Sequence, residues 1–576
     1  MRSKFIFRIR LIAAFFVCVA ILLIARLYLV QVVHGEEYRQ RAENQHIRPS
    51  ANLLSRGSIY FTRKDGTLIS AATLQSGYTI AVIPQQIEDA TLALSKLQGI
   101  VPVPEAEFMA KAAKADAPYE ELLRKVSEEK GDRVRQADIS GVEAYRERWR
   151  YYPGGTLAAH EIGLIGYGPD GTAEAGQYGL ERSYQSPLSR PESGFAINFF
   201  ADLFANVGTR ILSDDGGPGA DLVTSIEPSV QAELEDTLRA YNSKWNSKIV
   251  GGIVMDPKTG AVFAMASLPT FDPNDVKGAD PNSLANPLTE RVYEFGSTMK
   301  PITIAAALDA GAITPATKYN DTGSITIDTE KISNYDGKAR GVVSVQEVLS
   351  QSLNVGISFV VQKMGTETFR EYMDRFGITE ETGIDLPGEA SPLVSNLESP
   401  RIVEYVTAGF GQGVAVTPVA MARALATLAN HGEVPGIHVG TELRYPGGVT
   451  KKVGWTPPRT AIRAETSETL SRMLVTVVDT ALSGGKARVP EMSIAAKTGT
   501  AQIAMPGGGG YYTDRYLHSF FGYFPAYEPR FLIFFFAVEP VGAKYASETW
   551  TDPFISTVKF LTTYYQVPPD RPLNNE

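Results

Sequence analysis

The longest apolar stretch of the chain lies near its N-terminus, between residues 11 and 33. As a helix this stretch would be about 34 Å long, which is enough to cross a bilayer. The segment before it contains four basic side chains and no acidic one, which places residues 1–10 in the cytoplasm and the rest of the chain outside. A cleavable signal peptide is the alternative, but the apolar pattern resumes at Leu27 and no clear cleavage site follows. We therefore expect an uncleaved, single-pass membrane anchor.

One charged side chain, Arg26, interrupts this expected anchor. A charge inside an apolar span is costly, and two interpretations stay open. Arg26 extends to the membrane surface, or it meets a polar group on a partner membrane helix. The only cysteine, Cys18, lies in the same segment, so the exported part of the chain can form no internal disulfide.

Beyond the anchor, the hydrophobic pattern changes from helical to mixed. Apolar residues recur at helical spacing in Glu105–Lys114 and Pro118–Lys130, which predicts two helices. The short run Phe531–Val538 cannot cross a membrane and predicts a buried strand. The strongest cluster of chain-breaking residues, Ser213–Asp221, precedes strand-like runs that begin at Leu222. We therefore place a domain boundary near residue 220.

Composition and charge exclude several classes of protein. Hydrophobic residues make up 44% and charged residues 21% of the 576 positions, which is typical of globular domains rather than disordered or collagen-like chains. The mean hydropathy of -0.09 excludes a protein with many membrane spans. A net charge of -9 provides no surplus of cations for a nucleic-acid backbone. The six histidines show no metal-ligand spacing, so we expect no zinc site.

The first motif with a chemical meaning is the pair Ser297 and Lys300. The spacing of three residues puts both side chains on one face of a helix. There an unprotonated amine can take the serine proton and create a nucleophile without histidine. Gly296 permits a turn before the serine, and Pro301 falls in the first helical turn, where its missing N–H needs no partner. We expect Ser297 at the positive N-terminal end of a buried helix, which favours an oxyanion and lowers a lysine pKa.

The same Ser-x-x-Lys pattern occurs three more times, so the pattern alone is a weak signal. The other copies lie in a charged segment, in a glycine-rich turn and near the C-terminus: Ser127–Lys130, Ser483–Lys486 and Ser556–Lys559.

The second motif is Ser352 with Asn354. Ser344 and Glu347 have the spacing of a capping box, which predicts a helix over about 345–351, and a second helix starts at Asn354. In the turn between these helices both motif residues can face one cleft. There a serine can relay a proton and an asparagine can hydrogen-bond an amide. The alternative is an ordinary polar loop between two helices.

The third motif runs from Lys497 to Thr500. Short and β-branched residues without proline predict a strand, and the glycine inside it, Gly499, predicts close approach of another backbone. Lysine and threonine side chains beside it suit a carboxylate ligand. A strand that merely carries a lysine at a sheet edge is the alternative.

The three motifs follow one another in one order after residue 220, and this combination resembles the class B penicillin-binding proteins. Further matching segments extend the resemblance over nearly the whole chain: Arg56–Ile59 with Asp65–Gly66, Arg150–Gly154 with His160 and Gly163, Gly179–Glu181, Val254–Gly260 and Gly409–Pro418. There are two departures. Phe295 stands where the family often has proline, and Phe61–Thr62 replace an acidic-basic pair, with two extra residues before Gly66. Neither departure concerns a catalytic position.

The resemblance implies a mixed α/β fold. A transpeptidase domain of the serine β-lactamase type, with a central antiparallel sheet flanked by helices, would follow an elongated α+β pedestal of the dimerisation type and one N-terminal transmembrane helix. The corresponding boundaries are a cytoplasmic tail at 1–10, an anchor at 11–33, a pedestal at 34–220 and a transpeptidase domain at 221–576.

The resemblance also implies transpeptidation of peptidoglycan stem peptides, without a cofactor or metal. Ser297 would attack the D-Ala-D-Ala bond, with Lys300 as general base. Ser352 would relay a proton to the leaving amine with support from Lys497, and Asn354 would hold the donor peptide. The expected substrate-binding residues lie on the predicted strand: Thr498, Gly499 and Thr500. The N–H groups of Ser297 and Thr500 would form the oxyanion hole, and β-lactams would be covalent inhibitors.

The biological setting is also an expectation from resemblance. The tail at 516–540 and 564–570 and the segment at 407–426 look more like division-type than elongation-type enzymes, which implies a septal role in the plasma membrane, with the catalytic domain outside the cytoplasm. About 190 residues separate the anchor from the catalytic domain and match the pedestal, which leaves no room for a glycosyltransferase domain there. A separate membrane glycosyltransferase of the SEDS type and other division proteins are therefore the implied partners. An elongation-type enzyme, a hydrolysing carboxypeptidase or β-lactamase, and a catalytically silent scaffold remain alternatives.

Overall fold

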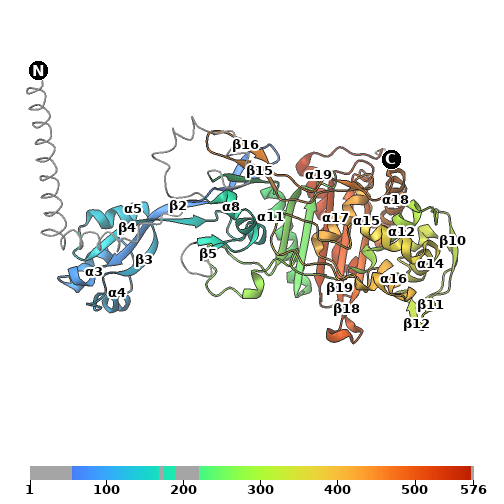
Figure 1. Cartoon of the computed structure of the whole chain (residues 1–576), viewed down its shortest axis with the longest axis horizontal. Coiled ribbons are helices and arrows are strands. Elements are labelled where there is room, and N and C mark those ends of the chain that lie inside the picture. The colour runs from blue at the N-terminus through green and yellow to red at the C-terminus, as the bar shows by residue number, and fades with distance from the viewer. Residues whose placement is uncertain (1–54, 168–173, 190–218, 573–576) are drawn as a thin grey trace, which may run out of the picture. The chain divides into compact units, whose positions relative to one another are not determined.

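The structure is a computed structural model, and it describes residues 55–167, 174–189 and 219–572 (Figure 1). The expected tail at 1–10 and anchor at 11–33, with Arg26 and Cys18, lie outside these described residues. Within the described ranges no helix is both long enough and apolar enough to cross a bilayer.

The described residues form two compact units. Unit 1 contains Leu74–Trp149, and unit 2 contains Arg56–Thr73 together with the chain from Arg150 onward. The expected domain boundaries at 34–220 and 221–576 stay predictions.

Unit 1 is built on a small sheet with helices against it. The second half of β2 (Leu68–Val82) pairs with β3 (Glu120–Ser127) and β4 (Val142–Tyr151). The helices are α3 (Ala90–Gln98), α4 (Glu105–Ala112) and α5 (Glu128–Gln136). Leu97, Phe108 and Val134 bring all three helices into one hydrophobic core with Tyr78 and Ile80 of β2.

The predicted helix at Glu105–Lys114 is confirmed by α4, but the predicted helix at Pro118–Lys130 is wrong, because most of that segment is strand β3. Tyr78 pairs with Val126 and Ile80 with Leu123, so β3 has one more residue than β2 between these pairs. Lys125, inside this bulge, has a φ of 57°. A bulge adds a residue to one strand, so the buried residues of β3 fall at a spacing that looks helical in the sequence.

Unit 2 contains a set of paired strands made from distant segments, apart from its main sheet. Its strand order is β16-β15-β7-β1-β2, and β1 runs parallel to β7. The strands other than β2 are β1 (Ile59–Thr62), β7 (Asp221–Thr224), β15 (Gly440–Arg444) and β16 (Thr450–Lys452). Next to β1 the buried Glu181 carboxylate accepts hydrogen bonds from Arg56 Nε at 2.5 Å and from Arg150 Nε at 2.6 Å. A buried carboxylate of this kind is tolerated because it is fully paired, so three of the family-like segments meet in one ion-pair cluster.

The main sheet of unit 2 has five antiparallel strands in the order β18-β19-β20-β8-β9. Their bounds are β8 (Ile249–Met255), β9 (Val262–Leu268), β18 (Ala495–Ala504), β19 (Tyr511–Phe524) and β20 (Phe531–Val538). This confirms the expected central antiparallel sheet and the predicted strand at Phe531–Val538.

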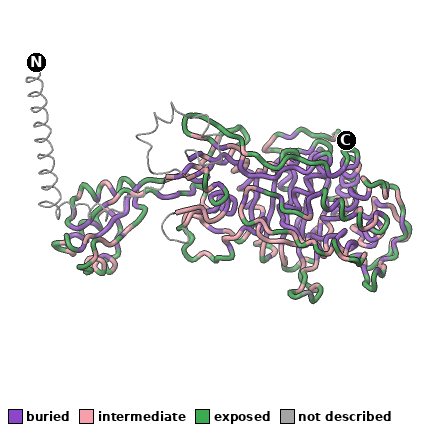
Figure 2. Tube along the Cα trace, in the orientation of Figure 1, coloured by how far each residue is buried: buried purple, intermediate pink, exposed green. Residues whose placement is uncertain are grey.

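Helices cover both faces of this sheet, and its strands β8 and β20 are buried over nearly their whole length (Figure 2). On one face lie α11 (Pro228–Trp245) and α19 (Ala546–Tyr565), whose Trp550 joins Phe531, Ile533 and Phe535 in one core. Leu532, Phe534 and Phe536 belong to the core on the other face. The helices of that core are α12 (Lys300–Asp309), α13 (Val345–Ser350), α14 (Asn354–Met364), α15 (Thr366–Arg375), α16 (Ile402–Gly409), α17 (Pro418–Ala429) and α18 (Ala464–Thr476). Because both faces of β20 are covered, its sequence is continuously apolar rather than alternating.

Candidate active site

The segment that carries Ser297 is a tight turn in front of a helix. Gly296–Thr298 form a 3-10 turn, and the α-helix α12 starts only at Lys300, so Ser297 precedes the helix instead of opening it as expected. Ser519 Oγ and Thr298 Oγ both donate to the carbonyl oxygen of Phe295, at 2.8 and 3.1 Å. These hydrogen bonds hold the turn, which explains why the helix begins one turn later than predicted.

Gly296 confirms the predicted need for a glycine before the serine. Its φ is +59°, and its N–H donates to the carbonyl oxygen of Gly411 at 3.0 Å. A Cβ on Gly411 would lie only 2.1 Å from the oxygen of Gly296. Two glycines that are far apart in sequence therefore bring two backbone segments together beneath Ser297.

Ser352 lies in the turn between α13 and α14, as predicted, and has a φ of 55°. The predicted capping box is wrong, because Ser344 is the N-cap residue of α13 but its side chain makes no cap hydrogen bond. The helix therefore begins where the spacing indicated, but without that pair of side-chain hydrogen bonds.

Hydrogen bonds join four of the predicted catalytic residues: Lys300, Ser352, Asn354 and Lys497. Lys300 Nζ donates to the carbonyl oxygen of Ser352 at 2.6 Å and to Asn354 Oδ1 at 2.7 Å, and it lies 3.3 Å from Ser352 Oγ. Lys497 Nζ donates to Ser352 Oγ at 3.1 Å. Ser352 therefore lies between the two lysines, and one polar chain joins the first, second and third motifs.

Both lysines are buried, and burial changes their charge. Lys300 is 0% exposed, and burial, followed by the nearby charge of Lys497, holds its pKa well below the usual range. Burial lowers the pKa of Lys497 to about 7. Removing an ammonium group from water disfavours its charged form, so the site holds an amine that can accept a proton near neutral pH.

Strand β18 carries the third motif and lies against the Ser297 turn. A Cβ on Gly499 would lie 2.4 Å from the oxygen of Phe295 and 3.0 Å from the nitrogen of Thr298, which confirms the predicted close approach of a second backbone. Thr498 and Thr500 are half-buried. Thr500 Oγ1 accepts from the N–H of Ala546 at 3.0 Å, so its own proton remains available to a ligand.

Two residues that hold this site carried no recognisable signal in the sequence. Ser519 donates to the oxygen of Phe295, and the oxygen of Ser333 accepts from Asn354. The remaining Ser-x-x-Lys copies lie on other elements: Ser127 precedes α5, Ser483 lies in a 3-10 turn and Ser556 lies within α19. In the described ranges no three or more histidine, cysteine or carboxylate side chains are grouped to hold a metal ion.

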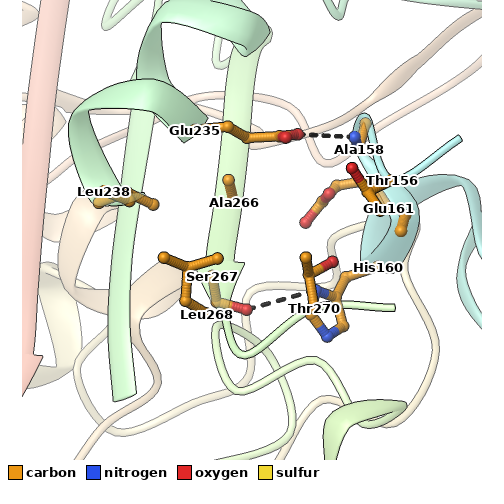
Figure 3. Close-up of a pocket in the computed structure, with 11 residues that line it drawn as sticks. Thr156, Ala158, His160, Glu161, Glu235, Leu238, Ala266, Ser267, Leu268 and Thr270 are labelled. Atoms are coloured by element: carbon orange, nitrogen blue, oxygen red, sulfur yellow. Dashed lines mark hydrogen bonds between the residues drawn. The ribbon is translucent and has the colours of Figure 1, made fainter. Parts of the chain in front are cut away.

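A separate small cavity lies beside the family-like segment that contains His160 (Figure 3). Its volume is about 10 Å³, room for about one water molecule. His160 Nε2 lies 2.8 Å from the oxygen of Ser283, and Nδ1 lies 3.3 Å from Ser267 Oγ. Burial lowers the pKa of His160 to about 4, so the ring is neutral at pH 7. This histidine has a partner at each ring nitrogen, and it serves packing rather than the Ser297 site.

Comparisons with known proteins agree with this geometry. Residues 250–555 match the penicillin binding protein transpeptidase domain, and residues 54–224 match the penicillin-binding protein dimerisation domain. The chain is 28% identical to stage V sporulation protein D of Bacillus subtilis over 561 residues, covering 96% of this chain and 84% of the relative. It is 30% identical to the probable peptidoglycan D,D-transpeptidase FtsI of Caulobacter vibrioides, covering 81% of this chain and 73% of the relative.

A solved structure shows the same fold. Penicillin binding protein 3 from Mycobacterium tuberculosis, complexed with aztreonam, matches with a TM-score of 0.68 at 23% identity, covering 90% of this chain and 98% of that chain. The chain belongs to the class B penicillin-binding proteins, which combine a dimerisation domain with a transpeptidase domain. It is a serine-type peptidoglycan D,D-transpeptidase that acts in cell-wall synthesis.

Proposed function

We propose that the protein cross-links stem peptides through an acyl-enzyme on Ser297, and that it does so at the division septum. The observation that carries the chemical part is the buried Lys300 amine, hydrogen-bonded to Ser352 and Asn354 and joined through Ser352 to Lys497. One connected group therefore contains a base (Lys300), a proton relay (Ser352) and a second lysine (Lys497).

The geometry favours neutral Lys300 as the base. A neutral amine has two N–H donors and one lone pair. The two short contacts, to the oxygen of Ser352 and to Asn354 Oδ1, use both donors. The lone pair is then left for the proton of Ser297, one helical turn away. As that proton moves to Lys300, Ser297 Oγ attacks the carbonyl carbon between the two D-alanines.

The second half of acylation needs a proton for the leaving amine. When the C–N bond breaks, Ser352 donates its hydroxyl proton to the departing D-alanine, and protonated Lys300 replaces that proton through the 3.3 Å contact. Lys497 stabilises the negative charge that develops on Ser352 Oγ. An amine from a neighbouring stem peptide then attacks the ester and loses a proton by the reverse route, which restores Ser297.

The substrate contacts are proposed from the position of β18 beside the serine turn. Thr498 and Thr500 would bind the terminal carboxylate, Asn354 would bind the donor amide, and the N–H groups of Ser297 and Thr500 would form the oxyanion hole. One such donor is typically worth about 100-fold to 1000-fold in rate. β-Lactams would acylate Ser297 by the same steps, as the names of the family and of the aztreonam complex suggest.

The septal role rests on likeness to the FtsI relative and on the C-terminal segments of the sequence. An elongation role within the same class is the alternative. Anchoring by residues 11–33, with the catalytic domain outside the cytoplasm and a SEDS-type glycosyltransferase as partner, belongs to the same proposal. Depletion of the protein should block septation and leave filamentous cells; swollen, rounded cells would favour elongation.

The acyl-enzyme is tested by labelling a membrane preparation with a fluorescent penicillin and mapping the modified peptide. We expect Ser297→Ala to abolish labelling, and Ser127→Ala, Ser483→Ala and Ser556→Ala to retain it. Labelling that survives Ser297→Ala would exclude this serine as nucleophile. A label that turns over within seconds, rather than persisting for minutes, would indicate a hydrolase instead.

A further inference from the structure

Helix α14, which begins with Asn354 of the site, lacks a capping side chain of its own. Its N-cap residue is Leu353, and no side chain of the cap residue accepts from the first N–H groups. The first N–H groups of a helix need partners from outside the helix. The N–H of Val355 finds one in Oδ1 of Asn334, at 3.1 Å. Asn334 thus caps α14 from the loop that follows β12 (Glu330–Ser333).

The other end of the Asn334 side chain is bound to a buried carboxylate. Asn334 Nδ2 donates to both carboxylate oxygens of Asp321, at 3.0 Å each, and also to the oxygen of Lys338 at 3.2 Å. Asn334 is 3% exposed and Asp321 is 1% exposed. Asp321 also accepts from the N–H of Arg340 at 2.9 Å. A carboxylate only accepts hydrogen bonds, so the amide can lie in one orientation only, with its oxygen toward α14.

The residue before Asn334 acts directly on the site. The carbonyl oxygen of Ser333 accepts from Asn354 Nδ2 at 2.9 Å. Because the amide nitrogen of Asn354 is held in this way, its Oδ1 faces Lys300 Nζ at 2.7 Å. The orientation of the Asn354 amide therefore depends on the position of Ser333. The neighbouring Asn334 holds that position through hydrogen bonds of its side chain to Asp321 and to the N–H of Val355.

We infer that Asn334 is a positioning residue for transpeptidation: by joining Asp321 to the start of α14, it holds Ser333 where its carbonyl turns the Asn354 amide toward Lys300. Asn334 acts on Lys300 through Ser333 and Asn354. This inference rests on the proposed role of Lys300 as base.

The first experiment exchanges the two partners in the full-length protein. Asn334→Asp puts two carboxylates against each other, and Asp321→Asn puts two amides together. In the double variant, Asn334→Asp with Asp321→Asn, the new amide donates to the new carboxylate, which still accepts from Val355. We expect each single variant to lose roughly tenfold in the acylation rate with a fluorescent penicillin, and the double variant to recover part of it, as is usual for directly coupled neighbours. Recovery should be incomplete because the new carboxylate cannot donate to the oxygen of Lys338 as Asn334 does.

The second experiment measures the acylation rate against pH in Asn334→Ala. An ammonium group on Lys300 donates to Asn354 Oδ1, so turning that amide away disfavours the protonated form of Lys300. The rising limb of the pH–rate profile should therefore move to lower pH while the plateau rate falls. Asn430→Ala is the matched control, since Asn430 is also buried but donates to the oxygen of Glu433 instead. The Asn430→Ala variant should have a lower thermal stability, but the rising limb of its pH–rate profile should lie at the same pH as in the wild type.

These measurements separate the inference from the proposed function. If Asn334→Ala changes only the unfolding temperature, or if the reciprocal exchange recovers nothing, Asn334 is structural and the inference is wrong. If Asn334→Ala does not fold, the charge-conserving exchange decides alone. Failure of the proposed function would appear separately, as labelling that survives Ser297→Ala or as acylation of Lys300→Arg at nearly the wild-type rate.

Discussion

Two lysines share one hydroxyl group in this site, and their surroundings assign them different tasks. Lys300 donates to the oxygen of Ser352 and to Asn354 Oδ1 and lies 3.3 Å from Ser352 Oγ, and its pKa lies well below the usual range. Lys497 reaches Ser352 Oγ and the oxygen of Thr498 from the neighbouring strand. Both amines can be neutral near neutral pH, so position separates their tasks: Lys300 lies one helical turn from Ser297 and suits proton transfer, and Lys497 suits stabilising charge on Ser352.

Lys300→Arg should be as inactive as Lys300→Ala. Arginine keeps the charge but does not lose its proton in proteins, so it cannot take the proton of Ser297. The measurement is the rate of acylation by a fluorescent penicillin, with thermal unfolding as the check that each variant folds. If Lys300→Arg acylates at nearly the wild-type rate, Lys300 is structural and another base must exist.

Glu161, in the wall of the small cavity, should make stability depend on pH. It is buried, and burial raises its pKa from 4.5 to about 8. A raised carboxyl pKa means that stability present below pH 4.5 is lost as the pH rises through about 8. Glu161→Gln cannot ionise, so it should unfold at a higher temperature than the wild type at pH 9 and at a similar one at pH 5.

The size of the stability change follows from the rise in the pKa of Glu161, since each pKa unit corresponds to about 1.4 kcal/mol. We expect a gain of up to a few kcal/mol for Glu161→Gln at pH 9. The control is Glu528→Gln, because the Glu528 side chain is 77% exposed. Equal pH dependence in all three proteins would show that Glu161 ionises without cost.

At the level of elements, the site is the contact between one turn and one strand. The Ser297 turn lies against β18 at Gly499. The Ser519 hydroxyl group of β19 donates to the carbonyl oxygen of Phe295 and so stabilises the turn. The sheet thus provides both the third motif and the support for the first. Phe295 stands where proline is frequent in the family, and its buried ring packs edge-on against Phe534 at 5.1 Å. The aromatic residue therefore adds packing where the family often has proline.

Gly499→Ala should abolish or strongly reduce acylation. The added Cβ would lie 2.3 Å from Ser519 Oγ and 2.4 Å from the oxygen of Phe295, so the strand and the turn would have to separate. Overpacking of this kind typically costs about 1–3 kcal/mol, and here it displaces Ser297 from β18. Gly509→Ala is the control, since its Cβ would have an ordinary contact of 3.7 Å with Met505. Wild-type acylation in Gly499→Ala would show that the contact is not required.

In the molecule as a whole, segments from the N-terminal part of the sequence belong to the same compact unit as Ser297. Strand β1 pairs with β7, and Arg56 and Arg150 pair with Glu181 in the same unit that contains Ser297. Arg56→Ala would leave one side of a buried ion pair without its partner, which is strongly destabilising. The family-like N-terminal segments therefore contribute to folding of the catalytic unit as well as to any contact with other wall proteins.

Exchange of residues 1–33 for an unrelated membrane anchor tests whether the expected anchor only tethers the enzyme. We expect the hybrid to reach the membrane and to label with penicillin, yet to fail to restore growth, because Arg26 would contact a partner helix. The measurements are fractionation, labelling and complementation. Full restoration of growth would show that Arg26 extends to the membrane surface and that the segment is only a tether.

Much of this site could be predicted from the sequence because its signals are local. Helices α13 and α14 start where the spacing around Ser344 and Asn354 indicated, and β18 is the strand predicted from Lys497–Thr500. Gly296 indicated a turn, and Gly499 indicated the close approach of a second backbone. Both features depend on the backbone at a single position, so one residue is enough to predict each. The order of three short motifs then identified the chemistry.

The tertiary structure decided what depends on residues far apart in the chain. The bulge in β3 arises from pairing with β2, so a strand had the hydrophobic spacing of a helix. The cap of α14 comes from Asn334, and the carbonyl that turns Asn354 toward Lys300 comes from Ser333. A hydrogen bond between distant residues leaves no periodic pattern along the sequence, because each partner is an ordinary polar residue until the fold brings the two together.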